Sequence, residues 1–255
     1  MRRPRMQTGT GTWMGLMTEQ GGASDEYEAV ALPPGPQMAA SSLGSAVFLR
    51  RSARPSRRAV LHLHDLTGSF APADLARWYN ERGFHFYVTD LEFREPLDSA
   101  GRRRPARSAR ACFAALDSAC GHMRGADGID AIILSAQDDA APVAALWCHA
   151  RRATSPVDAL ILSNPDFGKG LRARLDIACP VLVISAAAGP ARASGPGRRD
   201  RRRESTRLGQ HVTWLYIDQQ PAAPADYSAG RRRLFDEMGR WLGAYMYGQV
   251  RDQLL

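Results

Sequence analysis

The sequence predicts an α/β fold, a doubly wound and mostly parallel β-sheet with helices on both faces. Strand-like and helix-like segments alternate along most of the 255 residues, which is the order expected when helices connect parallel strands. One segment, 181–184, is fully apolar and follows Pro180, a good start for a buried strand. A chain of this length can bury a sizeable core in one domain.

The expected elements begin with two strands, 26–32 and 45–51, separated by a turn rich in proline, glycine and serine. In chain order there follow a buried strand over 59–64, a helix over 73–82 ended by Gly83, a strand over 84–89, a helix over 108–124, a strand over 129–135, a helix over 139–152, and strands over 157–162 and 181–184. The last elements are a strand over 212–217 and a helix over 231–245, whose apolar residues recur at helical spacing and are expected to face the core.

We expect a single domain over residues 25–248. Residues 1–24 are predicted to be a disordered N-terminal extension, and residues 249–255 a C-terminal tail. The segment 186–203 is rich in Gly, Pro, Ala, Ser and Arg. It is predicted to be a flexible loop, because it has too little apolar content to pack.

The net charge of +8 is carried almost entirely by arginine, since Lys169 is the only lysine. The arginines cluster at 102–104, 198–203 and 231–233, in or beside predicted loops and helix starts. Such a field attracts nucleic acid or anionic membranes non-specifically. Without interleaved aromatic residues or a nucleic-acid-binding motif, these arginines are interpreted as solvated surface, and no specific nucleic-acid partner is expected.

The four cysteines show neither metal-ligand spacing nor the density of a secreted disulfide scaffold. They are Cys112, Cys120, Cys148 and Cys179, and we interpret them as reduced, mostly buried thiols. No apolar run reaches the ~20 residues that span a bilayer, and the N-terminal segment lacks the apolar core of a signal peptide. The sequence therefore predicts a cytoplasmic protein without a membrane span.

Six stretches carry a resemblance to a known family. They are 58–65 (RAVLHLHD), 75–91 (LARWYNERGFHFYVTDL), 144–152 (AALWCHARR), 157–166 (VDALILSNPD), 179–185 (CPVLVIS) and 208–213 (LGQHVT). Together with the order of strands and helices, over about residues 26–247, they resemble the α/β-hydrolase superfamily. The chain is most similar to actinobacterial serine hydrolases of the serine aminopeptidase or monoglyceride-lipase type.

The resemblance implies a catalytic serine on a sharp strand-to-helix turn, in the motif G-x-S-x-G. Here that turn, the elbow, is residues 136–140, which read AQDDA. Asp138 occupies the nucleophile position, and Ala136 and Ala140 occupy the glycine positions. Asp138 is therefore interpreted as a degenerate nucleophile, and Gln137 is expected to line the pocket beside it.

The resemblance places the oxyanion side of the site after the third strand. Related enzymes carry His-Gly there, and this chain carries His64-Asp65. We expect Leu66 and Asp139 on the oxyanion side, with His64 and Asp65 lining the pocket. The carboxylates of Asp65 and Asp138 are expected to face one crevice at the carboxyl edge of the sheet, where they would oppose stabilisation of an oxyanion. Their mutual repulsion is expected to raise the pKa of at least one, unless arginine or a cation lies between them.

The other catalytic components of the resembled family are also missing. Its histidine follows the last strand, where this chain has Ala222, and no histidine follows His211, which is interpreted as structural. No carboxylate occurs at 186–190, where the acid is expected, and Asp200 is interpreted as a solvated ion-pair member within an arginine run. About a dozen residues join Asp166 to Cys179, too few for more than one short helix, so the family's cap is expected to be missing.

The first of three interpretations is a non-catalytic α/β-hydrolase-fold protein that binds a small molecule or a protein partner, a second copy of the chain included. The losses of nucleophile, base and lid support it. The second is a hydrolase of ester, lipid, epoxide or halide substrates that uses Asp138 as nucleophile, with His64 or His122 as an unconventional base.

The third interpretation is a divalent-cation site formed by Asp65, Asp138 and Asp139. Against it, Asp139 is also placed to be a helix N-cap, where a carboxylate interacts well with the helix dipole. One of His62 and His64, near the end of a buried strand, is expected to be a core residue. On balance no metal and no cofactor are expected at the site.

Overall fold

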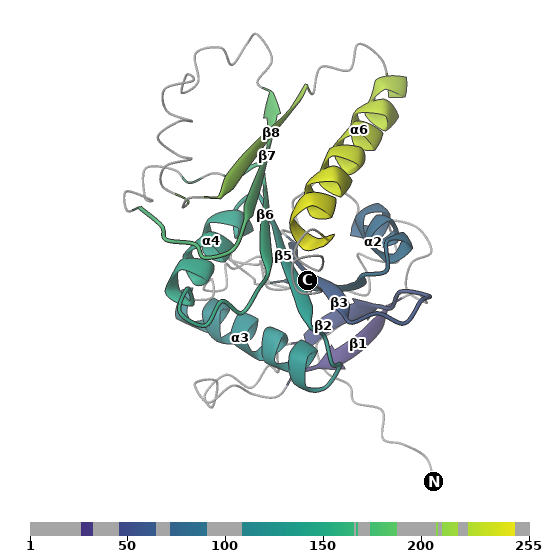
Figure 1. Cartoon of the computed structure of the whole chain (residues 1–255). Coiled ribbons are helices and arrows are strands. Elements are labelled where there is room, and N and C mark those ends of the chain that lie inside the picture. Colours follow the sequence, from purple (N-terminus) through teal and green to yellow (C-terminus); the bar gives the residue numbers. More distant parts are fainter. Residues whose placement is uncertain are drawn as a thin grey trace, which may run out of the picture.

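Eight strands of the described residues form one sheet in the computed structural model (Figure 1). The structure describes residues 27–32, 46–64, 72–90, 109–165, 167, 174–187, 208, 211–218 and 224–247. The strands are β1 (Glu28–Ala31), β2 (Ala46–Arg50), β3 (Arg58–His64), β4 (His85–Asp90), β5 (Ala131–Gln137), β6 (Ala159–Ser163), β7 (Val181–Ala187) and β8 (Val212–Asp218). Their order across the sheet is β1-β2-β4-β3-β5-β6-β7-β8.

The sheet is mostly parallel, as predicted. β1 pairs with β2, and β2 with β4, in antiparallel fashion. Every pair from β4 through β3 to β8 is parallel. All parallel strands therefore end at the same side, which we call the carboxyl edge, and begin at the opposite side, the amino edge. Ligand sites of open α/β sheets lie at the carboxyl edge.

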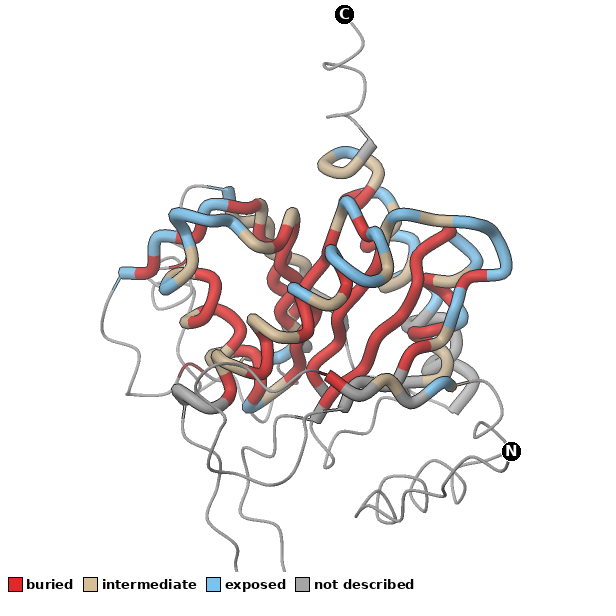
Figure 2. Tube along the Cα trace, turned by 90° about the horizontal axis from the view of Figure 1, so that it is seen from below, coloured by how far each residue is buried: buried red, intermediate tan, exposed pale blue. Residues whose placement is uncertain are grey.

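Helices cover both faces of the sheet, which confirms the doubly wound prediction (Figure 1). One face carries α2 (Pro72–Glu81) and α6 (Pro224–Leu242), followed by a short π-helix, Gly243–Tyr247. The other face carries α3 (Ala109–Gly125) and α4 (Ala140–Ala150). Figure 2 shows the buried residues concentrated in the strands and on the helix sides that face them.

The two layers of core follow from the alternation of side chains along each strand. In β3, Val60 packs in the α2/α6 layer, whereas Leu61 and Leu63 pack in the α3/α4 layer. Fully buried Trp147 of α4 fills the second layer, and its indole N–H donates to Asp117 of α3 at 3.0 Å. Both faces of the central strands are thus shielded from solvent, as in parallel sheets that have helices on both faces.

Helix α2 ends as the sequence predicts. Gly83 has a φ of 76°, a left-handed conformation that glycine adopts without steric cost. Its N–H donates to the Asn80 carbonyl, and the Phe84 N–H donates to the Tyr79 carbonyl, each at 3.0 Å. These bonds close the last turn of the helix and direct the chain into β4.

Several element boundaries differ from the sequence predictions, and three of the differences have a plain physical reason. β5 continues two residues further, to Gln137, because Gln137 still pairs with Ser163 of β6. β7 extends to Ala187, into the segment predicted as a loop, because it pairs with β8 to its end. Helix α6 begins at Pro224 instead of residue 231, since proline suits the first turn of a helix, where its missing N–H is not needed.

The connection from β6 to β7 spans only the residues between Ser163 and Val181. This length leaves no room for a cap domain. The predicted extension 1–24, the tail 249–255 and residues 188–203 lie outside the described part of the chain.

All four cysteines are free and buried, as predicted from their spacing. Within the described ranges, no helix is long and apolar enough to cross a membrane.

Candidate functional site

The elbow has the shape that the resemblance implies. β5 ends at Gln137 and α4 begins at Ala140, so that two residues make the turn. The first of them, Asp138, has a φ of 48°, in the left-handed region that side chains other than glycine rarely adopt. Its N–H donates to the Ser163 carbonyl of β6 at 2.9 Å, and its carbonyl accepts from the Ala141 N–H at 3.1 Å. The nucleophile position therefore lies at the carboxyl edge, fixed by backbone bonds on both sides.

The side chains of the elbow are polar and acidic. Gln137 is buried, and its amide Nε2 donates to Asp138 Oδ2 at 3.0 Å. Asp139 is exposed and is the N-cap residue of α4, but it makes no side-chain capping hydrogen bond. Ala136 and Ala140, at the glycine positions of the motif, are both fully buried. The turn thus has the left-handed backbone that the resemblance implies for a nucleophile elbow, and its first residue carries a carboxylate.

The oxyanion side of the site is only partly described. His64 is the last residue of β3, and Leu63 pairs with Ala136 of β5, so the ends of the two strands are neighbours at the carboxyl edge. Asp65 and Leu66 lie outside the described residues. The shared crevice of Asp65 and Asp138 therefore remains a prediction, and so does the role of Leu66.

A buried histidine–serine contact lies beneath the elbow. His62 of β3 and Ser135 of β5 are register partners, and His62 Nδ1 lies 3.1 Å from Ser135 Oγ. Both residues are buried, and the His62 ring packs beside Phe86. His62 is thus the core histidine expected of the pair at the end of β3. Its serine partner could not be identified from sequence spacing, because the two residues are 73 positions apart.

Two other histidines lie far from the elbow. His211 immediately precedes β8, and its carbonyl accepts from the Val181 N–H at the amino edge. His122, near the end of α3, forms an ion pair of 3.3 Å with Asp127 in the turn that leads to β5. The seven residues of β5 separate that turn from Asp138, roughly 20 Å at the rise of a strand. His122 therefore cannot act as a base for Asp138, which corrects one sequence-based alternative, and His211 lies at the opposite edge of the sheet from Asp138.

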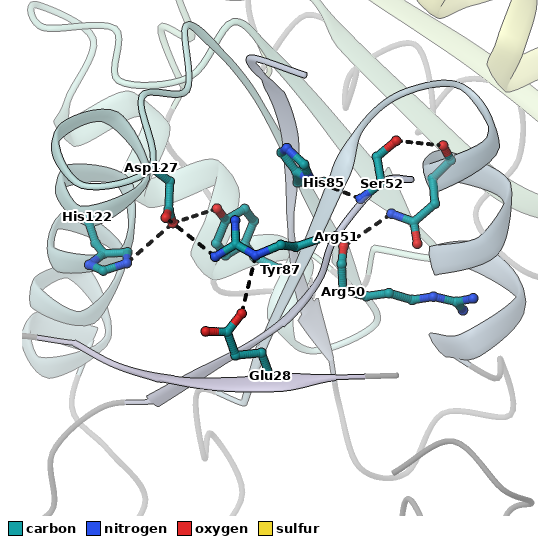
Figure 3. A network of polar contacts seen from close by, with 9 residues as sticks. Glu28, Arg50, Arg51, Ser52, His85, Tyr87, His122 and Asp127 are labelled. Carbon is teal, nitrogen blue, oxygen red and sulfur yellow. Dashed lines mark hydrogen bonds and ion pairs between the residues drawn. The ribbon is translucent and has the colours of Figure 1, made fainter. Parts of the chain in front are cut away.

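A polar network surrounds Asp127 (Figure 3). Its carboxylate accepts from the Tyr87 hydroxyl at 2.7 Å and pairs with His122, while Arg51 lies 3.9 Å away and also bonds Glu28. Burial, followed by the bond to Asp127, raises the pKa of Tyr87 well above its usual value. The network joins the turn before β5 to β4, β1 and the segment after β2, and no pattern in the sequence indicates it.

His85 belongs to a second set of contacts beside that network (Figure 3). Its Nδ1 accepts the Ser52 N–H at 3.0 Å, and its Nε2 lies 3.1 Å from the Ser56 carbonyl, to which it donates in the neutral tautomer. Burial lowers the pKa of His85, an effect that the Ser56 carbonyl partly opposes. The neutral ring thus holds the β2–β3 connection, away from the elbow.

The described side chains give no support for metal binding at the elbow. In the described part of the chain, no three His, Cys, Asp or Glu residues are arranged to hold a metal ion. Asp65 belongs to the proposed ligand set but is outside that part, so the cation interpretation stays a prediction. Ala222 and Asp200, which bear on the base and the acid, lie outside it as well.

Comparisons with known proteins concern the fold. No protein-family model matches the sequence, and no curated protein matches it either. Solved structures do match. An α/β serine hydrolase homologue from Coxiella burnetii has a TM-score of 0.58 and 14% identity over 86% of this chain and 97% of that chain.

A serine hydrolase without a lid, from Xanthomonas campestris, has a TM-score of 0.55 and 17% identity over 89% of this chain and 94% of that chain. Est1E from Butyrivibrio proteoclasticus has a TM-score of 0.54 and 11% identity over 83% of this chain and 99% of that chain. At these identities the likeness shows the fold alone. The chain therefore has the α/β-hydrolase fold.

Proposed function

We propose that the chain is a non-catalytic protein of the α/β-hydrolase fold whose elbow binds a small molecule or a protein partner. The observation that carries the proposal is the residue at the turn from β5 to α4, which is Asp138 in place of serine. A carboxylate has no hydroxyl to accept an acyl group in the way of a serine hydrolase. The acyl-enzyme chemistry of the fold is therefore lost at this position.

The distribution of histidines supports the proposal. β8 ends at Asp218, and none of the six histidines of the sequence follows it. The connection from β8 to α6, where the resemblance places the base, thus contains no imidazole. Removing the nucleophile and the base together eliminates most of the rate enhancement of a catalytic triad.

A binding role is supported by what the elbow retains. Asp138 keeps a left-handed backbone, a conformation that persists in non-glycine residues where the surroundings enforce it and that is frequent at ligand sites. The buried Gln137 amide orients its carboxylate. Asp139 adds a second, exposed carboxyl group at the edge where this class of sheet binds ligands.

The proposal is tested with active-site reagents. A fluorophosphonate probe is expected to leave the full chain unlabelled, and short p-nitrophenyl esters should hydrolyse no faster than with heat-denatured protein. A lidless serine hydrolase of the same fold serves as the positive control. Stoichiometric labelling of any serine, the buried Ser135 included, would refute the proposal.

A second candidate function is hydrolysis with Asp138 as nucleophile. The observation that favours it is the hydrogen bond from Gln137 to Oδ2, which fixes a carboxylate at the nucleophile position. In such a reaction a carboxylate oxygen bonds the substrate carbon while a halide or an epoxide oxygen leaves, and water then cleaves the ester. His64, at the end of β3, is the remaining candidate for the base that activates this water.

Turnover in H₂¹⁸O separates the two functions. An Asp138 ester that is hydrolysed at its carbonyl incorporates ¹⁸O into the tryptic peptide 125–151. The peptide would gain about 2 Da per exchanged oxygen with haloalkane or epoxide substrates, and none in Asp138→Ala. We expect no incorporation, and a substrate-dependent gain in the wild type would replace the proposed function with the second candidate.

A further inference from the structure

The two outer strands of the sheet, β1 and β8, differ in length and in charge. β1 has four residues, and its Glu28 is exposed and bonded to Arg51. β8 has seven residues, and the first six, 212–217, contain no charged side chain and no proline. Short length, charges and proline are the features by which an outer strand avoids pairing with another chain. β1 therefore has a protection that β8 lacks.

One side of β8 pairs with β7, and the other side is the outer side of the sheet. The Val181 N–H of β7 donates to the His211 carbonyl at 2.8 Å, so residue 211 faces β7. Successive residues in a parallel ladder direct their N–H and C=O groups to opposite sides of the strand. Val212 and every second residue after it therefore direct these groups away from β7. Among the described residues no strand lies on that outer side.

The side chains of β8 are only partly covered by the helices. Residues 212–215 are each partly exposed, whereas the apolar residues of β6, two strands further in, are fully buried. Trp214 packs against the α3/α4 layer of the core, and Leu215 packs against the α2/α6 layer. Apolar surface thus remains accessible on both faces of the outer strand, and its burial against a neighbouring sheet is favourable.

Helix α6 borders β8 on one face of the sheet. Of the strands in the described ranges, β8 is the one that α6 contacts most. Phe235 of α6 stacks on Trp78 of α2, with ring centroids 5.2 Å apart, and α2 packs on β4, nearer the other outer strand. α6 therefore lies between α2 and the outer side of β8, where it would be the first helix to meet a neighbouring molecule.

The charges of α6 complement one another in an antiparallel arrangement of two copies. A basic pair, Arg232 and Arg233, is followed about one turn later by an acidic pair, Asp236 and Glu237. Both arginines and Asp236 are exposed, and Glu237 pairs with Arg240 of its own helix at 3.2 Å. When two copies of α6 lie side by side in opposite directions, Arg233 of one copy lies opposite Asp236 of the other. This pair forms twice, so α6 is electrostatically complementary to itself.

We propose that two copies of the chain associate through β8, which pairs antiparallel with its counterpart and continues the sheet from one copy into the other. A twofold axis perpendicular to the sheet relates the copies, so every contact is made twice. The axis aligns the outward N–H and C=O groups of both strands, covers the side chains of 212–215, and sets the α6 helices in opposite directions. The association is independent of the proposed function, because none of these residues belongs to the elbow.

Sedimentation velocity over a series of protein concentrations tests the association in the full chain. We expect a reversible equilibrium between the chain and a species of twice its mass. Arg233→Asp places like charges opposite one another at two symmetric positions, and so does Asp236→Arg. Each variant should raise the dissociation constant roughly tenfold or more. The double variant restores opposite charges and should recover most of the lost affinity.

Arg77→Asp is the matched control. It makes the same change of charge at an exposed arginine of α2, the helix that packs on β4, and should leave the dissociation constant unchanged. Hydrogen exchange locates the paired strand. The Val212 amide should be protected at concentrations at which the copies associate, and should exchange faster in Asp236→Arg. Circular dichroism of each variant should match the wild type, since the substituted side chains are exposed.

Two results in the wild type alone would overturn the inference, without relying on any variant to fold. They are a chain that stays monomeric at every concentration, and a dimer in which the Val212 amide still exchanges rapidly. A dimer that neither charge reversal weakens, or a double variant as weak as the single ones, would place the interface elsewhere. An equal loss of association in Arg77→Asp would contradict the pairing of the α6 helices.

Discussion

The polar side chains at the two edges of the sheet make different kinds of contact. Near the amino edge, Asp127 joins Tyr87, His122 and Arg51, which come from separate elements (Figure 3). At the carboxyl edge, a side-chain hydrogen bond within the elbow links two adjacent residues, Gln137 and Asp138. Contacts of the first kind hold distant segments together, whereas a contact between neighbours orients one side chain.

Under the proposed function, this difference distinguishes groups that stabilise the fold from groups that are presented for binding. A buried polar atom must be paired, and the cost of losing the partner falls on the free energy of unfolding. Asp138 is a partly exposed carboxylate that its neighbour orients. We expect its replacement to change the free energy of unfolding only a little. The comparison predicts large stability effects around Asp127 and small ones at Asp138.

Asp127→Ala is expected to have the largest effect. It removes the acceptor of the fully buried Tyr87 hydroxyl together with the partner of His122, and the free energy of unfolding should fall by about 2–3 kcal/mol. Urea unfolding measures it. The matched control is Asp130→Ala, three residues away, whose ion pair with Arg57 is solvent-exposed and should be worth less than about 0.5 kcal/mol. Equal losses in the two variants would contradict the structural role of the network.

The pH dependence of stability should show the contribution of His85. Burial lowers its pKa in the folded state, so below the ordinary value of about 6.5 the unfolded chain takes up a proton before the folded chain does. The contribution of His85 is therefore present above about pH 6.5 and is lost as the pH falls from there toward the lower folded pKa. Thermal midpoints measured from pH 7.5 to 5 should decline more steeply in the wild type than in His85→Asn.

The asparagine side chain of that variant keeps an acceptor near the Ser52 N–H but does not titrate. The matched control is His149→Asn, which changes a partly exposed histidine at the end of α4. If His85→Asn and the wild type give parallel midpoint curves, the neutral ring is not what holds the β2–β3 connection.

The fold was predictable from the sequence because its signals are local. Apolar runs, helical spacing and Gly83 indicated the order of strands and helices, and the resemblance to a known family placed the elbow between a strand and a helix. The ends of β5 and β7 were placed wrongly because they depend on strand pairing: Gln137 is polar, but its pairing with β6 keeps it in the strand. Contacts such as His62–Ser135 and Tyr87–Asp127 join residues 73 and 40 positions apart, and no spacing rule brings such pairs together.

Asp138→Gly should be mildly stabilising. Glycine adopts a φ of 48° without steric cost, so the free energy of unfolding should rise by about 0.5 kcal/mol. The increase is small because aspartate tolerates this region and because the hydrogen bond from Gln137 is lost. Asp139→Gly is the matched control. Asp139 has an ordinary helical φ of −66°, so glycine at this position should only lower the free energy of unfolding. A loss above about 1 kcal/mol in Asp138→Gly would mean that the carboxylate is tied into the fold, and the contrast between the two edges would fail.

Asp138→Ser should have the smallest effect of all, namely no gain of esterase activity. The substitution supplies a serine at a turn whose backbone is already left-handed, but no histidine follows β8 to take its proton. Asp65 also stays where the resemblance places the oxyanion side. Ester turnover should equal that of the wild type, and the fluorophosphonate probe should remain unreactive. The triple variant Asp138→Ser, Asp65→Gly, Ala222→His supplies all three groups where the resemblance places them and is the matched positive arm. Clear turnover by the single variant would show that another residue, His64 first among them, serves as the base, and that the carboxyl edge is closer to catalysis than its residues indicate.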